Sequence, residues 1–527
     1  MIPQKESPSE KSRRLLRRGK SGLLRLVFSR AGLVALLLLL QVGLLLVMSL
    51  KFEDYLVHYY GAFSLLSAFM VLYLLRTDSD PSAKITWLVL ILLAPVAGSL
   101  LYMYVHTDVG HRALKARVRQ LTKAARPVLP ATEADGALTR SFPADAGIAR
   151  YLRDSMGFHA YDRTAVRYFP LGDDFLPVLL ADLEQARSFI FLEYFIIEEG
   201  EMWGAVADVL ERKAREGVKV RVLCDGTCEF TKLHRSFLRE LREKGIQCRL
   251  FAPIRPFIST HYNYRDHRKI AVVDGRVAYT GGVNLADEYI NRAHPFGHWK
   301  DTAIRVEGEA ARSFLLMFLQ LWQVEERGVS FGPYLQQPVP PVPEAPGYVI
   351  PYGDCPLDNQ PVGEWVYTHI LNVARDYVHI MTPYLILDDK LENALKFAAS
   401  RGVDVSIILP HIPDKKIPFA LAKTHYRTLV ESGVKIYEYV PGFLHAKSFV
   451  SDGLRGVVGT INLDYRSLSH HFECGAYLCG TPCIGDIEAD FQETLKRCRR
   501  VTAQEAAHPG LYWRLVGTLM KPFAPLL

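Results

Sequence analysis

The sequence has few of the residues that build metal centres or disulfide frameworks. It contains 8 cysteines among 527 residues, and neither a C-x-x-C pair nor an H-E-x-x-H motif occurs. The sequence therefore lacks the common zinc-site signatures, and we predict that the protein uses no metal and no other cofactor. The cysteines, loosely clustered near residues 224–228 and 474–483, are predicted to be small buried residues.

Neither sign of charge is in large excess over the chain as a whole, because 63 Lys and Arg are balanced by 56 Asp and Glu and the formal net charge is +7. No basic groove studded with aromatic residues is recognisable, which counts against a nucleic-acid partner. The exception is residues 1–30, where nine Lys and Arg face two Glu. We predict a basic N-terminal arm that is attracted to anionic membrane lipids.

The arm leads into residues 31–50, which carry no charge and are long enough to cross about 30 Å of hydrocarbon as a helix. The run is too long for a cleaved signal peptide and has no small-residue cleavage site. Apolar segments follow at 61–75 and 86–105, the second with a kink expected at Pro95 and Gly98. We predict a membrane region over residues 31–105 with two to three transmembrane helices, and a basic linker over 106–135.

The membrane orientation is ambiguous. The basic arm favours a cytoplasmic N-terminus, and three spans would then place the rest of the chain outside the cell. Residues 111–126, directly after the last apolar segment, are strongly basic and favour the cytoplasm. The predicted location is a multi-pass protein of the cell membrane, and family precedent, described below, favours a cytoplasmic catalytic domain.

Beyond residue 136 helical and strand patterns alternate, and the whole order occurs twice. The first copy reads helix, strand, helix, strand over residues 175–187, 188–195, 201–217 and 218–225; the second repeats it over 362–375, 376–384, 389–402 and 403–410. Such alternation predicts parallel sheets covered by helices. The predicted fold class is α/β, with two duplicated α-β-α domains on a pseudo-twofold axis, preceded by transmembrane helices.

The predicted domains are residues 136–330 and 348–510, joined by a proline-rich linker at 331–347. The apolar segment at 511–527 either lies on the bilayer or packs as a helix on the domain. The loop at 412–418 leaves a strand end and could touch lipid headgroups, but we predict that it is a solvated loop.

One motif occurs in both copies with equal internal spacing. In the first copy the motif consists of His267, Lys269, Asp274, Gly281 and Asn284. In the second copy the same residue types recur at the same spacing, as His445, Lys447, Asp452, Gly459 and Asn462. Because residues i and i+2 of a strand share a face, each His projects together with its Lys. The Asp-Gly pairs are predicted hairpin turns.

Folding each hairpin about its turn is expected to place Gly282 opposite His267 and Thr460 opposite His445. The amides of Asn284 and Asn462 would then be able to donate to a bound phosphate oxygen. Asp274 lies roughly 23 Å from His267 along an extended strand, at about 3.3 Å per residue. We therefore expect a structural role for Asp274 and Asp452 within the motif.

A catalytic histidine needs a carboxylate to fix its tautomer. Asp301 and Glu473 are the candidates, because each opens the strand that follows its hairpin. The neighbouring residues His470 and His471 could be ligands, but a surface pair beside Glu473 is the simpler interpretation.

Two such motifs facing each other would present two His, two Lys and two Asn to one pocket. This set suits a phosphodiester and its transition state without a metal. One imidazole would attack phosphorus to give a phosphohistidine, and the other would protonate the leaving alkoxide.

The paired H-x-K-x4-D pattern resembles the phospholipase D superfamily over about residues 136–510. NYRDHRKIAVVDG with GGVNLADEYI, and GFLHAKSFVSDG with VGTINLDYRSLSHHFE, resemble bacterial cardiolipin synthases more narrowly. The resemblance implies phosphatidylglycerol as substrate and cardiolipin as product. It further implies that His267 is the nucleophile and His445 the acid.

Other functions remain open from the sequence. Water could resolve the phosphohistidine, which would make the protein a phospholipase D, or the acceptor could be serine or ethanolamine. A nuclease is less favoured, because the chain has apolar segments that suit a membrane protein. A membrane-anchored lipid-binding scaffold with an inactive site is also less favoured, because no residue of the two motifs is missing. The sequence does not define an oligomeric state.

Overall fold

The computed structural model describes residues 30–77, 81–106, 109–228, 233–234, 236–253, 264–326, 328–340, 342–343 and 345–526. The predicted basic arm, except Arg30, lies outside these residues. The chain divides into two compact units, residues 1–112 with 254–260 and residues 113–253 with 261–527.

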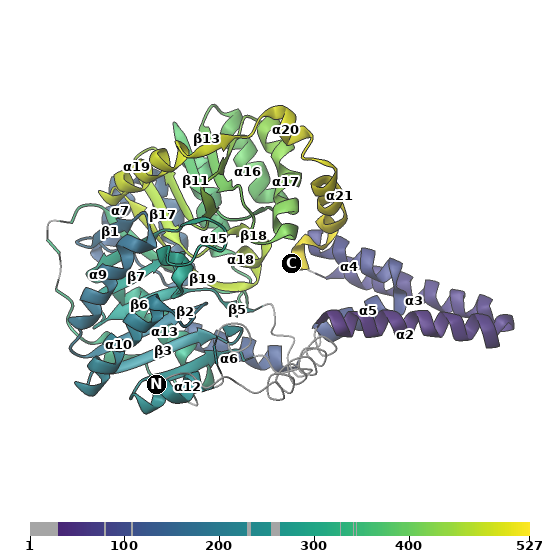
Figure 1. Ribbon diagram of the computed structural model, residues 1–527, viewed down its shortest axis with the longest axis horizontal. Coiled ribbons are helices and arrows are strands. Elements are labelled where there is room, and N and C mark those ends of the chain that lie inside the picture. The colour runs from purple at the N-terminus through teal and green to yellow at the C-terminus, as the bar shows by residue number, and fades with distance from the viewer. Residues whose placement is uncertain are drawn as a thin grey trace, which may run out of the picture. The chain divides into compact units, whose positions relative to one another are not determined.

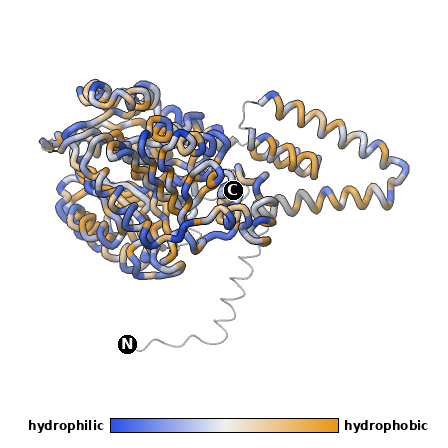
Figure 2. Tube along the Cα trace, turned by 90° about the horizontal axis from the view of Figure 1, so that it is seen from above, coloured by the Kyte–Doolittle hydropathy of each residue, from blue (hydrophilic) through white to orange (hydrophobic). Residues whose placement is uncertain are grey.

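The first unit consists of apolar helices, namely α2 (Arg30–Lys51), α3 (Leu56–Arg76), α4 (Pro81–Leu93) and α5 (Pro95–His106). Figure 2 shows hydrophobic residues along most of their length. The predicted break at Pro95 is confirmed, since α4 ends two residues before it. Gly98 lets the two helices meet closely there, because a Cβ on this residue would lie 2.6 Å from the carbonyl oxygen of Leu90.

Gln41, a polar residue within the apolar helix α2, forms a hydrogen bond with the backbone next to this break. Its side-chain oxygen accepts a hydrogen bond of 3.0 Å from the backbone N–H of Ala97, in the first turn of α5. An amide freed by a proline needs such a partner where water is excluded. Gln41 is buried accordingly.

Among the described residues, one helix is long and apolar enough to span a membrane, Val57–Arg76. Shorter apolar helices cover Leu39–Lys51 and Ala83–Leu93. Large apolar side chains such as Leu65, Phe69 and Leu72 are exposed on the long helix. The number of spans therefore stays a prediction.

The second unit contains two mixed sheets of matching strand order (Figure 1). In the first the order is β1 (Ala165–Phe169), β9 (Ala303–Glu307), β7 (Val277–Gly281), β6 (Lys269–Val273), β2 (Phe189–Tyr194), β3 (Lys219–Asp225) and β4 (Gln247–Phe251). In the second it is β10 (Tyr348–Asp354), β19 (His471–Cys479), β17 (Arg455–Gly459), β16 (Ser448–Ser451), β11 (Tyr377–Met381), β13 (Asp404–Pro410), β14 (Lys435–Tyr439) and β20 (Cys498–Arg500).

The helices repeat as well, and the predicted helix–strand order of both copies is confirmed. The helices of the first half are α9 (Gly172–Glu184), α10 (Glu201–Arg215), α12 (Phe237–Glu243) and α13 (Ala311–Trp322). Those of the second half are α15 (Val362–Val373), α16 (Asp389–Ser400), α17 (Lys416–Glu431) and α19 (Cys483–Leu495). Every residue of β2 is buried, and all of them except Glu193 are apolar or aromatic, as expected for a strand covered on both faces.

The predicted parallel pairing is confirmed for the strands on which it was based, β2 with β3 and β11 with β13, but both sheets are mixed. Within the two large sheets, the strands β2–β3–β4 and β11–β13–β14 pair in parallel. The helical crossovers produce those parallel pairs, whereas the hairpins β6–β7 and β16–β17 and their outer neighbours add antiparallel strands.

Short strands join the two halves directly. β5 (Arg265–Asp266) of the first half pairs with β19, and β15 (Gly442–Leu444) of the second pairs with β8 (His298–Lys300). One buried apolar cluster includes Phe314 and Phe318 together with Phe472 and Ile484. The halves therefore form one body around a shared interface.

Smaller elements complete the second unit. They are α6 (Val109–Ala125), α7 (Glu133–Ser141), α8 (Ala146–Arg150), a π-helix (Tyr151–Met156), α14 (Gly332–Leu335), β12 (Leu385–Ile386), β18 (Leu463–Asp464), α18 (Tyr465–Ser469), α20 (Ala503–Ala507) and α21 (Leu511–Met520). The predicted basic linker contains α6, whose Val118 and Leu121 pack into the core. The cysteines are free, and six of the eight are buried, as predicted.

Candidate active site

Each H-x-K motif leads into a tight hairpin. Asp274 and Gly275 at the first turn have φ of 51° and 66°, and Asp452 and Gly453 at the second have 55° and 63°. Positive φ at both central residues is the geometry that Asp-Gly favours. The predicted hairpin turns are confirmed.

The motif aspartates tie these turns to the central strands. The Asp274 carboxylate accepts hydrogen bonds of 2.8 Å from the backbone N–H groups of Arg187, Ser188 and Phe189. Asp452 accepts three equivalent bonds of 3.0 Å from residues 375–377. Both carboxylates therefore bind backbone at the entrance to β2 and β11.

The expected position of Gly282 and Thr460 is wrong by one residue. The register pairs Ala271 with Tyr279, so Lys269 faces Gly281, and His267 precedes the strand altogether. Gly282 instead leaves room for a carboxylate, because a Cβ there would lie 1.9 Å from Asp301 Oδ1. In the second half the Thr460 hydroxyl donates to Glu473.

Each histidine is held by the opposite half of the molecule. His267 N–H donates to the carbonyl of Phe472 (3.0 Å), and its Nδ1 lies 2.9 Å and 3.0 Å from the two Glu473 oxygens. His445 N–H donates to the carbonyl of Lys300 (2.7 Å), and its Nδ1 lies 2.6 Å from Asp301 Oδ2. The structure thus brings both predicted orienting carboxylates to the histidines, in crossed pairs.

The motif lysines are buried beside the same histidines. Lys269 Nζ donates to the His267 carbonyl at 2.6 Å, and Lys447 Nζ lies 2.8 Å from His445 Nδ1. Burial lowers the pKa of Lys269 to about 8 and that of Lys447 to about 7. Burial thus disfavours the charged form of both lysines, and a bound anion would favour it.

The histidines share one electrostatic environment. Burial, and then the positive charges of Lys269 and Lys447, lower the pKa of His267 well below its usual range. The same causes lower the pKa of His445, with Lys447 acting more strongly than Lys269. Because each histidine senses the lysine of the other half, the two motifs line one site. Burial raises the pKa of Asp301 to about 7.

The two motif asparagines differ. The Asn284 oxygen accepts from the N–H of Ile196 (3.0 Å), and its amide donates to the Tyr289 hydroxyl (2.7 Å). The side chain that was predicted to bind phosphate is therefore engaged within the protein. Asn462 is buried, and its Oδ1 has no hydrogen-bond partner among the described residues.

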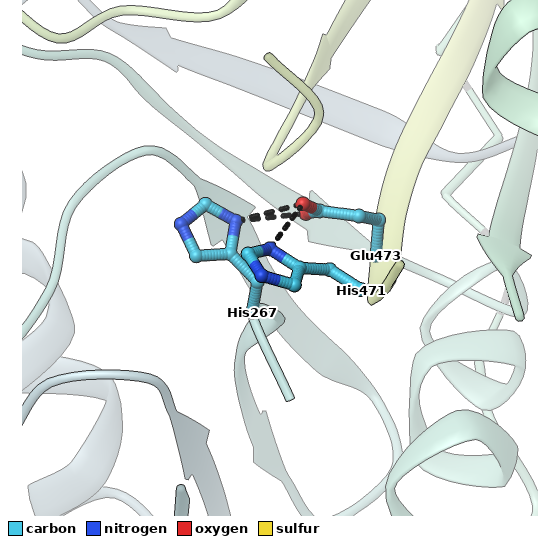
Figure 3. A group of neighbouring side chains, drawn as sticks. All are labelled: His267, His471 and Glu473. Carbon is cyan, nitrogen blue, oxygen red and sulfur yellow. Dashed lines mark hydrogen bonds and ion pairs between the residues drawn. The ribbon is translucent and has the colours of Figure 1, made fainter. Parts of the chain in front are cut away.

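His471 is the residue that the sequence analysis misjudged. It is buried rather than exposed, its ring centroid lies 5.3 Å from that of His267, and its Nδ1 lies 3.6 Å from Glu473 Oε1 (Figure 3). Burial lowers the pKa of His471 to about 3. Its spacing of two from Glu473 on β19 was the available signal, since both side chains share one strand face.

His267, His471 and Glu473 also form a group that could hold a metal ion. Their ligand atoms lie within 4.8 Å of one another, and Figure 3 shows both imidazoles turned toward the carboxylate. Two imidazoles and a carboxylate suit zinc. Because Glu473 already orients His267, a metal would compete with that role.

A duplicated α/β fold that brings two H-x-K motifs to one buried interface defines a member of the phospholipase D superfamily. The family model described as "Cardiolipin synthase, PLD-like domain" matches residues 179–322 and 367–495. A second, described as "Phospholipase_D-nuclease N-terminal", matches residues 65–105.

Similar proteins place the chain more narrowly. It is 30% identical to a cardiolipin synthase of Halalkalibacterium halodurans over 95% of this chain and 100% of the relative. A cardiolipin synthase of Geobacillus kaustophilus is 36% identical over 68% and 71% of the two chains. An uncharacterized protein of Streptococcus mutans is 52% identical over 87% and 99%.

The chain therefore belongs to the bacterial cardiolipin synthase family and is a membrane-associated phosphatidyltransferase. The crystal structure of a phosphatidylserine synthase of Haemophilus influenzae has the same fold, with a TM-score of 0.55 at 15% identity. That likeness covers 70% of this chain and 94% of the solved one.

Proposed function

We propose that this protein is a cardiolipin synthase that uses phosphatidylglycerol twice. A phosphatidyl group leaves one phosphatidylglycerol, rests on His267, and passes to the terminal hydroxyl of a second molecule. The products are cardiolipin and glycerol. The family membership supports the substrate, and the site geometry supports the route.

The single observation that carries the assignment of roles is the difference between the two Nδ1 environments. Nδ1 of His267 faces the two oxygens of Glu473, which accept a proton, and Thr460 donates to the same carboxylate. This favours the tautomer with the proton on Nδ1, so Nε2 keeps its lone pair and can attack phosphorus. His267 is therefore the proposed nucleophile.

Nδ1 of His445 faces donors instead. The Lys447 ammonium lies 2.8 Å away, and Asp301, with its pKa raised to about 7, can contribute a proton from the other side. Donors at Nδ1 favour a proton on Nε2. As Nε2 gives that proton to the leaving alkoxide, Nδ1 takes one from Asp301, so the imidazole stays neutral. His445 is therefore the proposed acid.

The first step forms the P–N bond at His267 Nε2 and breaks the P–O bond to the glycerol headgroup. His445 Nε2 gives its proton to the leaving alkoxide, and free glycerol departs. In the second step the hydroxyl of another phosphatidylglycerol gives its proton to His445 and attacks phosphorus. The P–N bond then breaks, which restores His267.

Lys269 and Lys447 supply the positive charge for the non-bridging oxygens as negative charge develops on them. A buried ammonium acts more strongly there than it would in water, because the surrounding dielectric is low. Phosphatidyl transfer by this route uses no metal and no nucleotide.

The experiment is product analysis with purified full-length protein in detergent and EDTA, supplied with phosphatidylglycerol alone. The proposal expects cardiolipin and free glycerol in equal amounts, both lost in His267→Ala. Phosphatidic acid without cardiolipin would show that water is the acceptor. Activity that requires added serine or ethanolamine would show another phosphatidyltransferase.

A further inference from the structure

The C-terminal helix α21 packs firmly on helix α17 by one face. Gly517 lies so close to α17 that a Cβ on it would be 2.7 Å from the carbonyl oxygen of Ala420. The ring of Trp513 lies edge-on to Phe419, with centroids 5.0 Å apart. Figure 1 shows α21 running beside α17. This packing fixes which face of α21 points outward.

The outward face of α21 is apolar. Leu511, Leu515 and Leu519, spaced four residues apart, are 84%, 58% and 61% exposed, and Tyr512 beside them is also exposed. Residues four apart lie on one side of a helix. A helix that packs by one face and carries large apolar side chains on the other needs a further apolar partner.

Basic residues border this face. Residues 511–527 contain Arg514 and Lys521 and no acidic residue. Lys415 and Lys416 are exposed where α17 begins, one turn before the Phe419 that Trp513 covers. Ile412 and Ile417 in the same loop are exposed as well. Apolar side chains rimmed by Lys and Arg match an anionic membrane surface.

The same loop reaches the active site. Lys415 Nζ lies 3.5 Å from the Tyr384 hydroxyl, which donates to Asp414 at 2.6 Å. The positive charge of Lys415 also lowers the pKa of both His267 and His445. Lys415 also lines a cavity together with Phe443, whose ring centroid lies 5.8 Å from that of His445, so this segment lies beside the second histidine.

We propose that the outer face of α21, together with the loop 412–417, is a bilayer-docking surface of the catalytic unit. Leu511, Leu515 and Leu519 enter the edge of the hydrocarbon, while Lys415 and Lys416 bind lipid phosphates. This surface brings the active site to the headgroups, so a lipid can move into the site without leaving the membrane.

Depth-dependent fluorescence quenching tests the contact. Full-length protein with Leu515→Cys, carrying an environment-sensitive label, is reconstituted into phosphatidylglycerol–phosphatidylcholine vesicles that contain nitroxide-labelled lipids. Phe397→Cys on α16, where the native residue is 57% exposed, is the matched control. We expect quenching at position 515 by shallow nitroxides and none at position 397.

An unquenched label at 515 would overturn the proposal. A blue-shifted but unquenched label would mean that protein, either another copy or another part of this chain, covers the helix. This readout needs no catalysis, so it stays interpretable if the proposed reaction proves wrong.

A kinetic comparison tests the consequence. The variant Leu511→Ser/Leu515→Ser/Leu519→Ser is assayed on vesicles and on monomeric short-chain phosphatidylglycerol. We expect the ratio of the vesicle rate to the monomer rate to fall by about tenfold, which corresponds to a loss of about 1.4 kcal/mol of membrane interaction. Phe397→Ser should keep the wild-type ratio. An equal fall on both substrates would assign α21 a structural role and contradict the proposal.

Discussion

Nδ1 of His267 lies 3.0 Å from Oε2 of Glu473, a residue of the other repeat. The reverse pair, His445 with Asp301, crosses the interface in the opposite direction at 2.6 Å. Neither repeat alone can therefore orient its own histidine. Each histidine therefore has its carboxylate partner only where the two halves meet.

Replacing Glu473 should affect chemistry more than folding. Glu473→Gln keeps the size of the side chain but offers one acceptor oxygen and an N–H₂ group in place of a carboxylate. The His267 tautomer is then no longer fixed, and we expect kcat to fall by roughly 10²–10⁴-fold while KM changes little. Steady-state kinetics check this, with circular dichroism to show that the variant folds. A variant with unchanged kcat would remove Glu473 from the mechanism.

Asp274 should prove to be structural. Asp274→Asn loses charged acceptors for three backbone N–H groups, which we expect to lower the free energy of unfolding by about 2 kcal/mol. Thermal unfolding in detergent measures this loss, and Asp452→Asn is the matched variant in the second half. If Asp274→Asn unfolds at the wild-type temperature yet is inactive, the aspartate is part of the chemistry.

The pH dependence should reflect the lysines. The pKa of Lys447 is about 7 and that of Lys269 about 8, so both are charged at lower pH and lose the proton as the pH rises through these values. We therefore expect kcat/KM to fall on the alkaline side from about pH 7, where Lys447 loses its proton first. In Lys447→Arg, which stays charged, the alkaline fall should move up towards pH 8, where Lys269 titrates, even if the maximum is lower. An alkaline fall at the same pH would exclude Lys447 as its cause.

Removal of metal should leave the reaction intact. The proposed steps use His, Lys and carboxylates only, so excess EDTA is expected to leave the rate of glycerol release unchanged. If EDTA abolishes activity, and zinc restores it in wild type but not in His471→Ala, the group His267, His471 and Glu473 is a catalytic metal centre. That outcome would replace the phosphohistidine mechanism.

Local spacing predicted much of the fold and the site. The alternation of periods predicted the paired helices and strands to within a few residues, and the two Asp-Gly pairs predicted the hairpin turns. The failures concern contacts between distant segments. Strand direction outside the crossovers, the burial of His471 and the crossed pairing of carboxylates all depend on how the halves meet, and nothing in the local pattern encodes that.

The register of the hairpins failed for a related reason. The prediction assumed that the strand extends back to His267, but the strand begins at Lys269 because His267 N–H bonds to Phe472 of the other half. The backbone of His267 thus pairs with the other half of the molecule, and the hairpin strand begins two residues later, at Lys269. The amide of Asn284 was likewise assigned to a ligand because its partner Tyr289 could not be placed from the sequence alone.

The most direct test of the proposed mechanism is to trap the covalent intermediate. Protein is mixed with phosphatidylglycerol labelled in its phosphate, quenched within one turnover in alkali, and cleaved for peptide mapping. We predict label on His267, reduced in His445→Ala because the leaving glycerol then lacks its proton donor, and absent in His267→Ala. Label on His445 would reverse the two roles. No protein-bound label in any variant, with cardiolipin still formed, would contradict the phosphohistidine route.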